Sequence, residues 1–188
     1  MIKPIAVFLW EKIDTPGHDS CCLFKLLNGW RLTGAAIFRD NGRPCYLQYD
    51  IAVDRGWKTR RAKVTGYIGK KYVDLRIAKA GAARWKLNGI FRRRVTDCID
   101  LDLGFTPSTN LIAIRRLALH VGQRAEAPAA YLQFPEMRLV KLPQSYLRIG
   151  HTEYKYKAPT VGYAGTLHVL PTGAVIEYPG LFKLVVSG

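Results

Sequence analysis

Apolar and polar side chains alternate with a period of two over most of this sequence, and breaks that contain glycine or proline interrupt the alternation every few residues. Residues 43–54 show it most clearly, because the odd positions from 45 onward are apolar and most of the even positions are polar. Successive side chains of a β-strand point to opposite faces of the sheet, so this pattern is typical of a half-buried strand. We expect Asp50 and Asp54 to be the more exposed side. The side chains expected to be buried are Cys45, Leu47, Tyr49, Ile51 and Val53.

Similar short runs recur along the chain and predict a single antiparallel meander of a dozen or more strands. Turn-forming pairs such as Asn28-Gly29, Asn41-Gly42 and Thr172-Gly173 separate them, as hairpin loops require. Besides 43–54, we expect strands within residues 5–13, 21–27, 30–38, 57–68, 71–79, 97–103, 152–158, 163–170, 174–178 and 182–186.

A sheet of this size cannot stay flat, because strand twist curls it. The expected fold class is therefore mainly β, one domain over residues 1–188 whose meander curls into a spiral β-roll or half-barrel. A curled sheet encloses space along its concave face, which predicts a sheet-lined ligand cavity. The pattern leaves open a closed sandwich with a solid core.

Two segments are less regular. Residues 109–120 fit a helix with Thr109 as its cap, but they also alternate as a strand does, and we favour the strand. Residues 123–130 (QRAEAPAA) are interpreted as a surface loop.

The positive charge of the chain is concentrated in one region. Residues 55–94 hold 14 of the 29 Lys and Arg but one of the 14 Asp and Glu, so they carry +13 of the net charge of +15. A field of this sign attracts polyanions such as nucleic acid, anionic lipid head groups or an acidic protein. Charge alone does not choose among them.

The sequence carries no motif for a catalytic nucleophile, a phosphate-binding loop or a metal site, and we expect no cofactor. The four cysteines (Cys21, Cys22, Cys45 and Cys98) form no CxxC pair and are expected to be reduced and mostly buried. No apolar run approaches the 20 or so residues of a spanning helix, and no export signal is recognised. A cytoplasmic location is therefore expected.

Charged residues on two expected strands predict a polar cluster. Arg60 shares its parity with Ala62 and Val64, which places it inward or at a cavity mouth unless it lies beyond the core and is solvated. Asp100 and Asp102 share one face of another strand. An unpaired buried charge is costly, so we expect an arginine among Arg60, Arg115 and Arg116 to lie within hydrogen-bonding reach of Asp100 or Asp102.

Several segments resemble the bacterial putative glycolipid-binding family. They are VDRGWKTRRAKVTG (53–66), DCIDLDLGFTPSTN with IRRLAL (97–119), FPEMRLVKLPQSYLR (134–148), YKY (154–156) and YPGLF (178–182). The resemblance covers nearly the whole chain. It implies a spiral β-roll similar to that of periplasmic lipoprotein carriers, which bind acyl chains in a concave sheet.

Two functions follow as hypotheses. The first is non-enzymatic binding of a lipid or glycolipid, or of an anionic membrane surface, with polar contacts from Arg60, Asp100, Asp102, Asn110, Arg115 and Arg116. The second is nucleic-acid or polyanion binding by the basic segment, whose aromatic side chains (Trp57, Tyr67, Tyr72, Trp85 and Phe91) could stack on bases. Its basic patch comprises Lys58, Arg61, Lys63, Lys70, Lys71, Arg92, Arg93 and Arg94. A hydrolase acting through Asp100 and Asp102 is a distant third.

Overall fold

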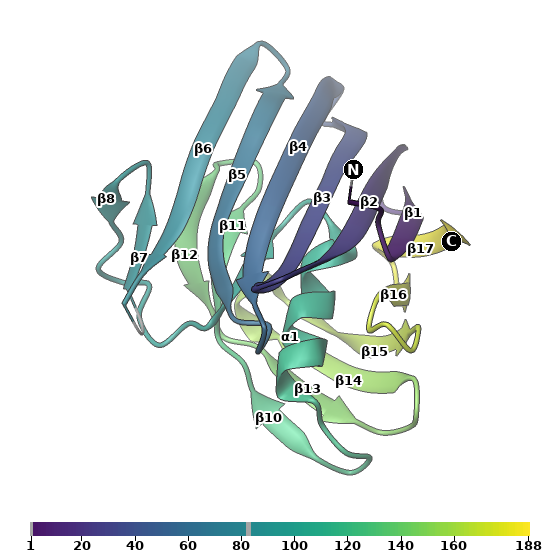
Figure 1. Ribbon diagram of the computed structural model, residues 1–188. Helices are drawn as coiled ribbons and strands as arrows, with labels where there is room; N and C mark the ends of the chain where they lie inside the picture. The colour runs from purple at the N-terminus through teal and green to yellow at the C-terminus, as the bar shows by residue number, and fades with distance from the viewer. Residues whose placement is uncertain (1, 82–83) are drawn as a thin grey trace.

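The computed structural model describes residues 2–81 and 84–188 and confirms the mainly β fold class. A large antiparallel sheet of 14 strands curls into a half-barrel that is not closed (Figure 1). A small sheet of three strands and one helix lie inside the curl. Among the described residues, no helix has the length and apolar composition needed to cross a bilayer.

The large sheet takes its strands from both ends of the chain. Its first half comprises β1 (Ala6–Lys12), β2 (Gly17–Leu26), β3 (Gly29–Asp40), β4 (Arg43–Asp54), β5 (Thr59–Ile68), β6 (Lys71–Ala80), β7 (Arg84–Leu87) and β8 (Ile90–Phe91). Its second half comprises β10 (Arg124–Glu126), β13 (Ser145–Arg148), β14 (Glu153–Ala158), β15 (Tyr163–Val169), β16 (Val175–Tyr178) and β17 (Phe182–Ser187). The halves join where β17 pairs with β1, so that Phe8 lies opposite Ser187.

The inner layer holds the remaining elements. Strands β9 (Asp100–Leu103), β11 (Ala129–Gln133) and β12 (Arg138–Leu142) form the small sheet, in which β9 and β11 run parallel. The short 3-10 helix η1 (Pro107–Thr109) leads into α1 (Asn110–Leu117). A second one, η2 (Pro159–Val161), lies outside this layer and connects β14 to β15 of the large sheet. A parallel pair needs a crossover, and α1 lies within that crossover.

Strand β4 shows the expected alternation. The odd-numbered side chains from Cys45 to Val53 are all buried, whereas Asp50 and Asp54 are half-buried. Cys21, Cys45 and Cys98 are also buried, and all four cysteines are free thiols, as expected.

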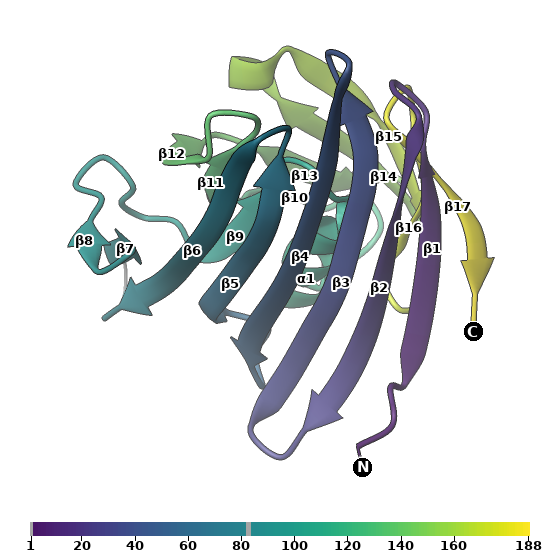
Figure 2. The same ribbon diagram turned by 90° about the horizontal axis from the view of Figure 1, so that it is seen from above.

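The inner layer packs directly on the concave face of β2 to β6. Leu47 and Val64 of that face belong to the same buried cluster as Leu101 of β9 and Leu111 of α1. Figure 2 shows α1 enclosed between this wall and the strands on the opposite side. The space in which a sheet-lined cavity was expected is therefore occupied along β2 to β6 by the chain itself.

The strand expected at residues 109–120 is wrong, because residues 110–117 form α1. Leu111 and Ile112 pack into the cluster under the large sheet, while Ala113 and Ile114 pack into a second cluster against β13 to β16. With Asn110, five consecutive residues of the helix are buried, which is possible because both sides of this helix face protein. A helix buried around most of its circumference loses the 3.6-residue periodicity that would have identified it.

The prediction of a surface loop at residues 123–130 is also wrong. This stretch contains β10 and the start of β11, and Ala127, Ala129 and Ala130 are buried. Small side chains are needed here because strand β11 lies between β9 and β12 in the inner layer.

Arg60 does not point inward. A β-bulge shifts the pairing of β4 and β5, so that Val53 lies opposite Thr59 but Ala52 lies opposite Arg61. The extra residue breaks the parity, because Thr59 and Ala62 are both buried while Arg60 and Arg61 are both exposed. The solvated alternative for Arg60 is confirmed.

Candidate functional site

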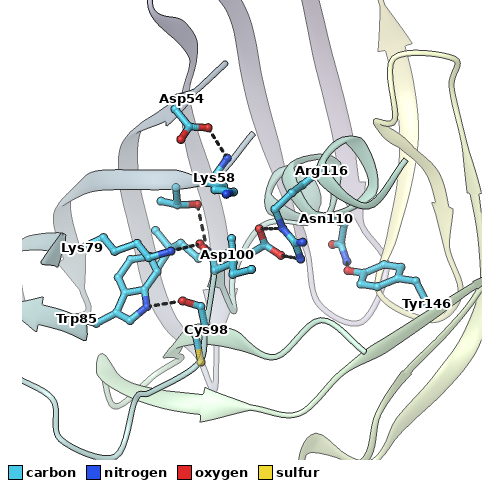
Figure 3. Close-up of polar contacts among 12 residues, drawn as sticks. Asp54, Lys58, Lys79, Trp85, Cys98, Asp100, Asn110, Arg116 and Tyr146 are labelled. Atoms are coloured by element: carbon cyan, nitrogen blue, oxygen red, sulfur yellow. Dashed lines mark hydrogen bonds and ion pairs between the residues drawn. The ribbon is translucent and has the colours of Figure 1, made fainter. Parts of the chain in front are cut away.

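The expected pairing of an arginine with the β9 carboxylates is confirmed by Arg116 and Asp100. Arg116 Nε and Nη2 donate to the two carboxylate oxygens of Asp100, each at 2.7 Å (Figure 3). The Asp100 side chain is 1% exposed and the Arg116 side chain 14%. Burial raises the pKa of Asp100, and the hydrogen bonds from Arg116 act in the opposite direction. This two-point pair fixes the last turn of α1 to β9.

The other two arginines of the expected cluster lie elsewhere. Arg115 is exposed and its guanidinium lies 5.4 Å from the ring centroid of Trp57. Arg60 pairs with Asp54 at 2.6 Å on the surface. The structure therefore brings together Asp100, Asp102, Asn110 and Arg116 but separates Arg60 and Arg115 from them.

A pocket of about 240 Å³ opens between β9 and the C-terminal strands. Asp102 and Asn110 line it from the inner layer, and apolar side chains such as Leu181 and Phe182 line it from the other side. Four tyrosines complete the wall, and we call this space the tyrosine pocket. They are Tyr131 of β11, Tyr156 of β14, Tyr163 of β15 and Tyr178 of β16.

The tyrosine rings hold one another in place. The centroids of Tyr163 and Tyr178 lie 4.8 Å apart with the planes at 72°, and those of Tyr156 and Tyr178 lie 5.9 Å apart at 84°. Edge-to-face packing of this kind is the preferred arrangement of aromatic pairs. Tyr156 also donates to the side-chain oxygen of Gln144 at 2.6 Å, and Tyr163 donates to the carbonyl of Pro179 at 3.2 Å. The aromatic wall is thus preorganised.

Asp102 is the charged group of this pocket. The strand register places it directly beside Tyr131, and Thr109 Oγ1 donates to it at 3.4 Å. In the described part of the chain, no lysine, arginine or histidine forms an ion pair with this carboxylate. Burial raises the pKa of Asp102 to about 7, and the nearby Asp100 acts in the same direction. Asp102 therefore titrates near neutral pH.

Two neighbouring residues shape the polar side of the pocket. A Cβ on Gly104 would lie 2.5 Å from the hydroxyl oxygen of Tyr131, so glycine is what allows that ring to lie flat against the backbone. Asn110 donates to Tyr146 Oη at 3.1 Å (Figure 3), and the Tyr146 ring in turn packs against Tyr156 of the pocket, with the centroids 4.8 Å apart.

A second buried polar cluster, centred on Asp19 of β2, was not predicted. Asp19 is fully buried and accepts hydrogen bonds from Thr106 and from Tyr49, whose hydroxyl lies 3.1 Å from both carboxylate oxygens. Burial raises the pKa of Asp19 to about 7. Since Thr106 caps η1, the cluster ties the inner layer to the large sheet.

The tyrosine pocket was missed as well, although the sequence carries a signal for it. Six of the ten tyrosines lie after residue 130, and part of them belong to the YKY and YPGLF motifs. Tyrosine enrichment in half-buried strands is a reason to expect an aromatic-lined site.

The expected basic patch is spread over the molecule. Arg61 and Lys63 lie on the exposed face of β5, and Lys58 and Lys70 lie beyond its two ends, which are about 30 Å apart by the rise of a strand. Lys71 begins β6, and Arg92, Arg93 and Arg94 follow β8. Of the aromatic residues expected to stack on bases, Trp57 and Trp85 are buried, whereas Tyr67, Tyr72 and Phe91 are exposed.

Among residues 2–81 and 84–188, no group of three or more His, Cys, Asp or Glu side chains is arranged to hold a metal ion.

The chain is similar to known proteins both in sequence and in fold. The model of a family described as "Putative glycolipid-binding" matches residues 7–183. The crystal structure of a DUF1089 family protein from Pseudomonas aeruginosa is similar to this chain with a TM-score of 0.77 and 27% sequence identity. The similarity covers 97% of this chain and 94% of that one. No curated protein matches the chain significantly.

Proposed function

The chain belongs to this family, and from that premise we propose that it binds a glycolipid whose sugar head group enters the tyrosine pocket. The observation that supports the proposal is the combination of four tyrosine rings with Asp102 and Asn110 around one space.

The chemistry of the pocket matches that of a sugar ring. A sugar presents C–H groups on its faces and hydroxyl groups around its rim. Rings such as Tyr163 and Tyr178 offer flat apolar surfaces for the faces, while Asp102 and Asn110 offer an acceptor and an amide for the hydroxyl groups. Binding pockets are commonly apolar with a few fixed polar groups, and this one has that composition.

The size of the pocket favours a head group over a whole lipid. Its 240 Å³ is below the roughly 300–1,000 Å³ of sites that enclose drug-sized ligands. Val161 of η2 lines the same pocket and is 50% exposed, which leaves an apolar exit for an acyl chain. In this proposal the sugar is enclosed and the chain lies against the surface beyond Val161.

Native mass spectrometry of protein purified without detergent, followed by lipid extraction, tests this function. We expect a bound glycolipid in stoichiometric amount. A clean apo mass after incubation with a bacterial lipid extract would count heavily against glycolipid binding.

Substitution of Asp102 tests the site. We expect Asp102→Asn to weaken binding of octyl glucoside, a short glycolipid, about 10-fold, because a hydrogen bond to a charged acceptor is stronger than one to an amide by about 1–1.5 kcal/mol. Isothermal titration calorimetry below the micelle concentration measures the affinity. Binding to the parent protein should tighten as pH rises through about 7, since Asp102 then ionises, and the variant should lose this dependence.

Asp74→Asn is the matched control, because Asp74 is an exposed acid on β6 outside the pocket. Its affinity for octyl glucoside should equal that of the parent. If 1-octanol bound as tightly as octyl glucoside, or if Asp102→Asn bound normally, the sugar would not be recognised in the tyrosine pocket.

A further inference from the structure

A second and larger concave site lies where the free edges of the two sheets meet. Strand β8 is the last strand of the large sheet and β12 is an edge strand of the small one. A groove of about 840 Å³ separates β12 from the turn that follows β8. In that turn Val95 N–H donates to the carbonyl of Arg92 at 2.9 Å, so that Arg93 and Arg94 occupy its two central positions.

The groove, which we call the arginine groove, has an apolar floor and a basic rim. Its apolar lining comes from Leu87, Phe91, Val95, Met137, Leu139 and Val140, and its basic lining from Arg92, Arg93, Arg94, Arg138 and Lys141. No acidic residue lines it. It shares no residue with the tyrosine pocket.

The cations of the groove are mostly unneutralised within the protein. Lys141 lies 3.7 Å from Asp97, whose side chain is 74% exposed at the margin. For the four arginines, no ion pair is formed with any acid in the described part of the chain. Guanidinium groups that line one groove repel one another, and an anion bound among them would relieve this repulsion.

Arg92 is the residue that most specifically indicates an anion-binding site. Its Nε is buried and has no hydrogen-bond partner among residues 2–81 and 84–188, and no other side-chain nitrogen or oxygen there shares both properties. A buried N–H without an acceptor destabilises the fold, and such groups are rare in native proteins. Arg92 lines the groove, so a small shift of its side chain would present this N–H to the groove, where an anionic oxygen could accept from it.

We propose that the arginine groove binds an amphiphile with a phosphate head group, the phosphate contacting Arg92 and its neighbours and the acyl chain lying on the apolar floor. Planar guanidinium groups match phosphate oxygens in two-point contacts. The volume falls within the range of sites that enclose drug-sized ligands, and the exposed ring of Phe91 extends the apolar floor to the surface. This site goes beyond the proposed sugar site, because it recognises an anionic head group rather than a neutral sugar and lies in a different part of the fold.

Three probes distinguish the contribution of the phosphate head group to binding from that of the acyl chain. They are octyl phosphate, 1-octanol and inorganic phosphate. Titration calorimetry should show octyl phosphate binding at least 10-fold more tightly than either of the others, because only octyl phosphate engages both the rim and the floor. Equal binding of 1-octanol would exclude recognition of the phosphate. Equal binding of inorganic phosphate would exclude use of the apolar floor.

Arg92→Met should weaken octyl phosphate binding at least 10-fold without lowering the melting temperature, because it removes a buried donor that lacks a partner while keeping the apolar stem. Arg138→Met provides a second variant on an exposed side chain of β12 and should also weaken binding. Arg61→Met is the matched control, since Arg61 is exposed on β5 outside the groove, and it should bind octyl phosphate normally.

Failure of the proposed phosphate site can be distinguished from failure of the proposed sugar site, because each site has its own probe and its own variant. Arg92→Met should bind octyl glucoside normally, and Asp102→Asn should bind octyl phosphate normally. Unchanged octyl phosphate binding by both Arg92→Met and Arg138→Met would overturn the proposal. So would a single-stranded oligonucleotide that binds more tightly than octyl phosphate and depends on the same two arginines, because the groove would then serve nucleic acid.

Discussion

Replacing Arg116 by methionine is expected to lower the free energy of unfolding by about 3–5 kcal/mol. The substitution leaves the carboxylate of Asp100, 1% exposed, without its two charge-assisted hydrogen bonds. Removing one partner of a buried pair is costly because the remaining charge stays desolvated. Urea denaturation followed by circular dichroism measures the change.

Two controls identify the cause. The double variant Asp100→Leu with Arg116→Met removes both charges and should recover most of the lost stability, since an apolar pair of similar size often replaces a buried ion pair without loss. Arg31→Met breaks an exposed pair with Asp50, and it should cost no more than about 1 kcal/mol. A loss below about 1 kcal/mol for Arg116→Met itself would show that the pair contributes no more than a surface contact.

Stability is expected to fall as pH rises from about 4 to about 7, because Asp19 is protonated in the folded state over this interval and ionised in the unfolded chain. Burial raises the pKa of Asp19 from 3.8 to about 7. Below pH 4 both states bind the proton, and above pH 7 neither does, so the change is confined between these values. Asp19 alone contributes a slope of about 1.4 kcal/mol per pH unit, which amounts to on the order of 4 kcal/mol. Asp102, whose pKa is also raised to about 7, acts in the same direction over the same interval.

Asp19→Asn isolates this contribution. Oδ2 of Asp19 accepts from both Thr106 and Tyr49, so an amide oxygen in its place can accept both bonds but cannot ionise. The stability of the variant relative to the parent should therefore increase between pH 4 and pH 7, as measured by urea denaturation at a series of pH values. Asp74→Asn, on an exposed acid, should leave the pH dependence as it is in the parent. Parallel pH profiles for Asp19→Asn and the parent would show that Asp19 is ionised in the folded protein throughout this range.

Much of the large sheet could be predicted from local pattern. Strand β4 contacts the core with one face only, so the alternation of buried and more exposed residues appears in the sequence as an alternation of apolar and polar residues. Pairing of an arginine with Asp100 or Asp102 was also predictable, because a charge on a buried strand requires a partner. The sequence left Arg60, Arg115 and Arg116 as candidates, and the structure selects Arg116.

Segments that contact protein on two sides could not be predicted in the same way. Helix α1 lies between two apolar clusters, so its buried residues are consecutive and match no single periodicity. Arg60 illustrates a different limit, because one inserted residue in β5 reverses the parity on which the argument rested. Neither the helix nor the bulge follows from the local secondary-structure preferences of its residues alone.

The sequence by itself determined the fold class, the exposed and buried faces of the regular strands and the concentration of positive charge in residues 55–94. Only the tertiary structure decided which of those charged side chains lie close to one another. It places Arg92 beside β12 but Lys58 and Lys70 at opposite ends of β5. It also brings Asp102 together with tyrosines of four different strands. The physical reason is that strand pairing and sheet curvature, rather than distance along the chain, set which side chains share a space.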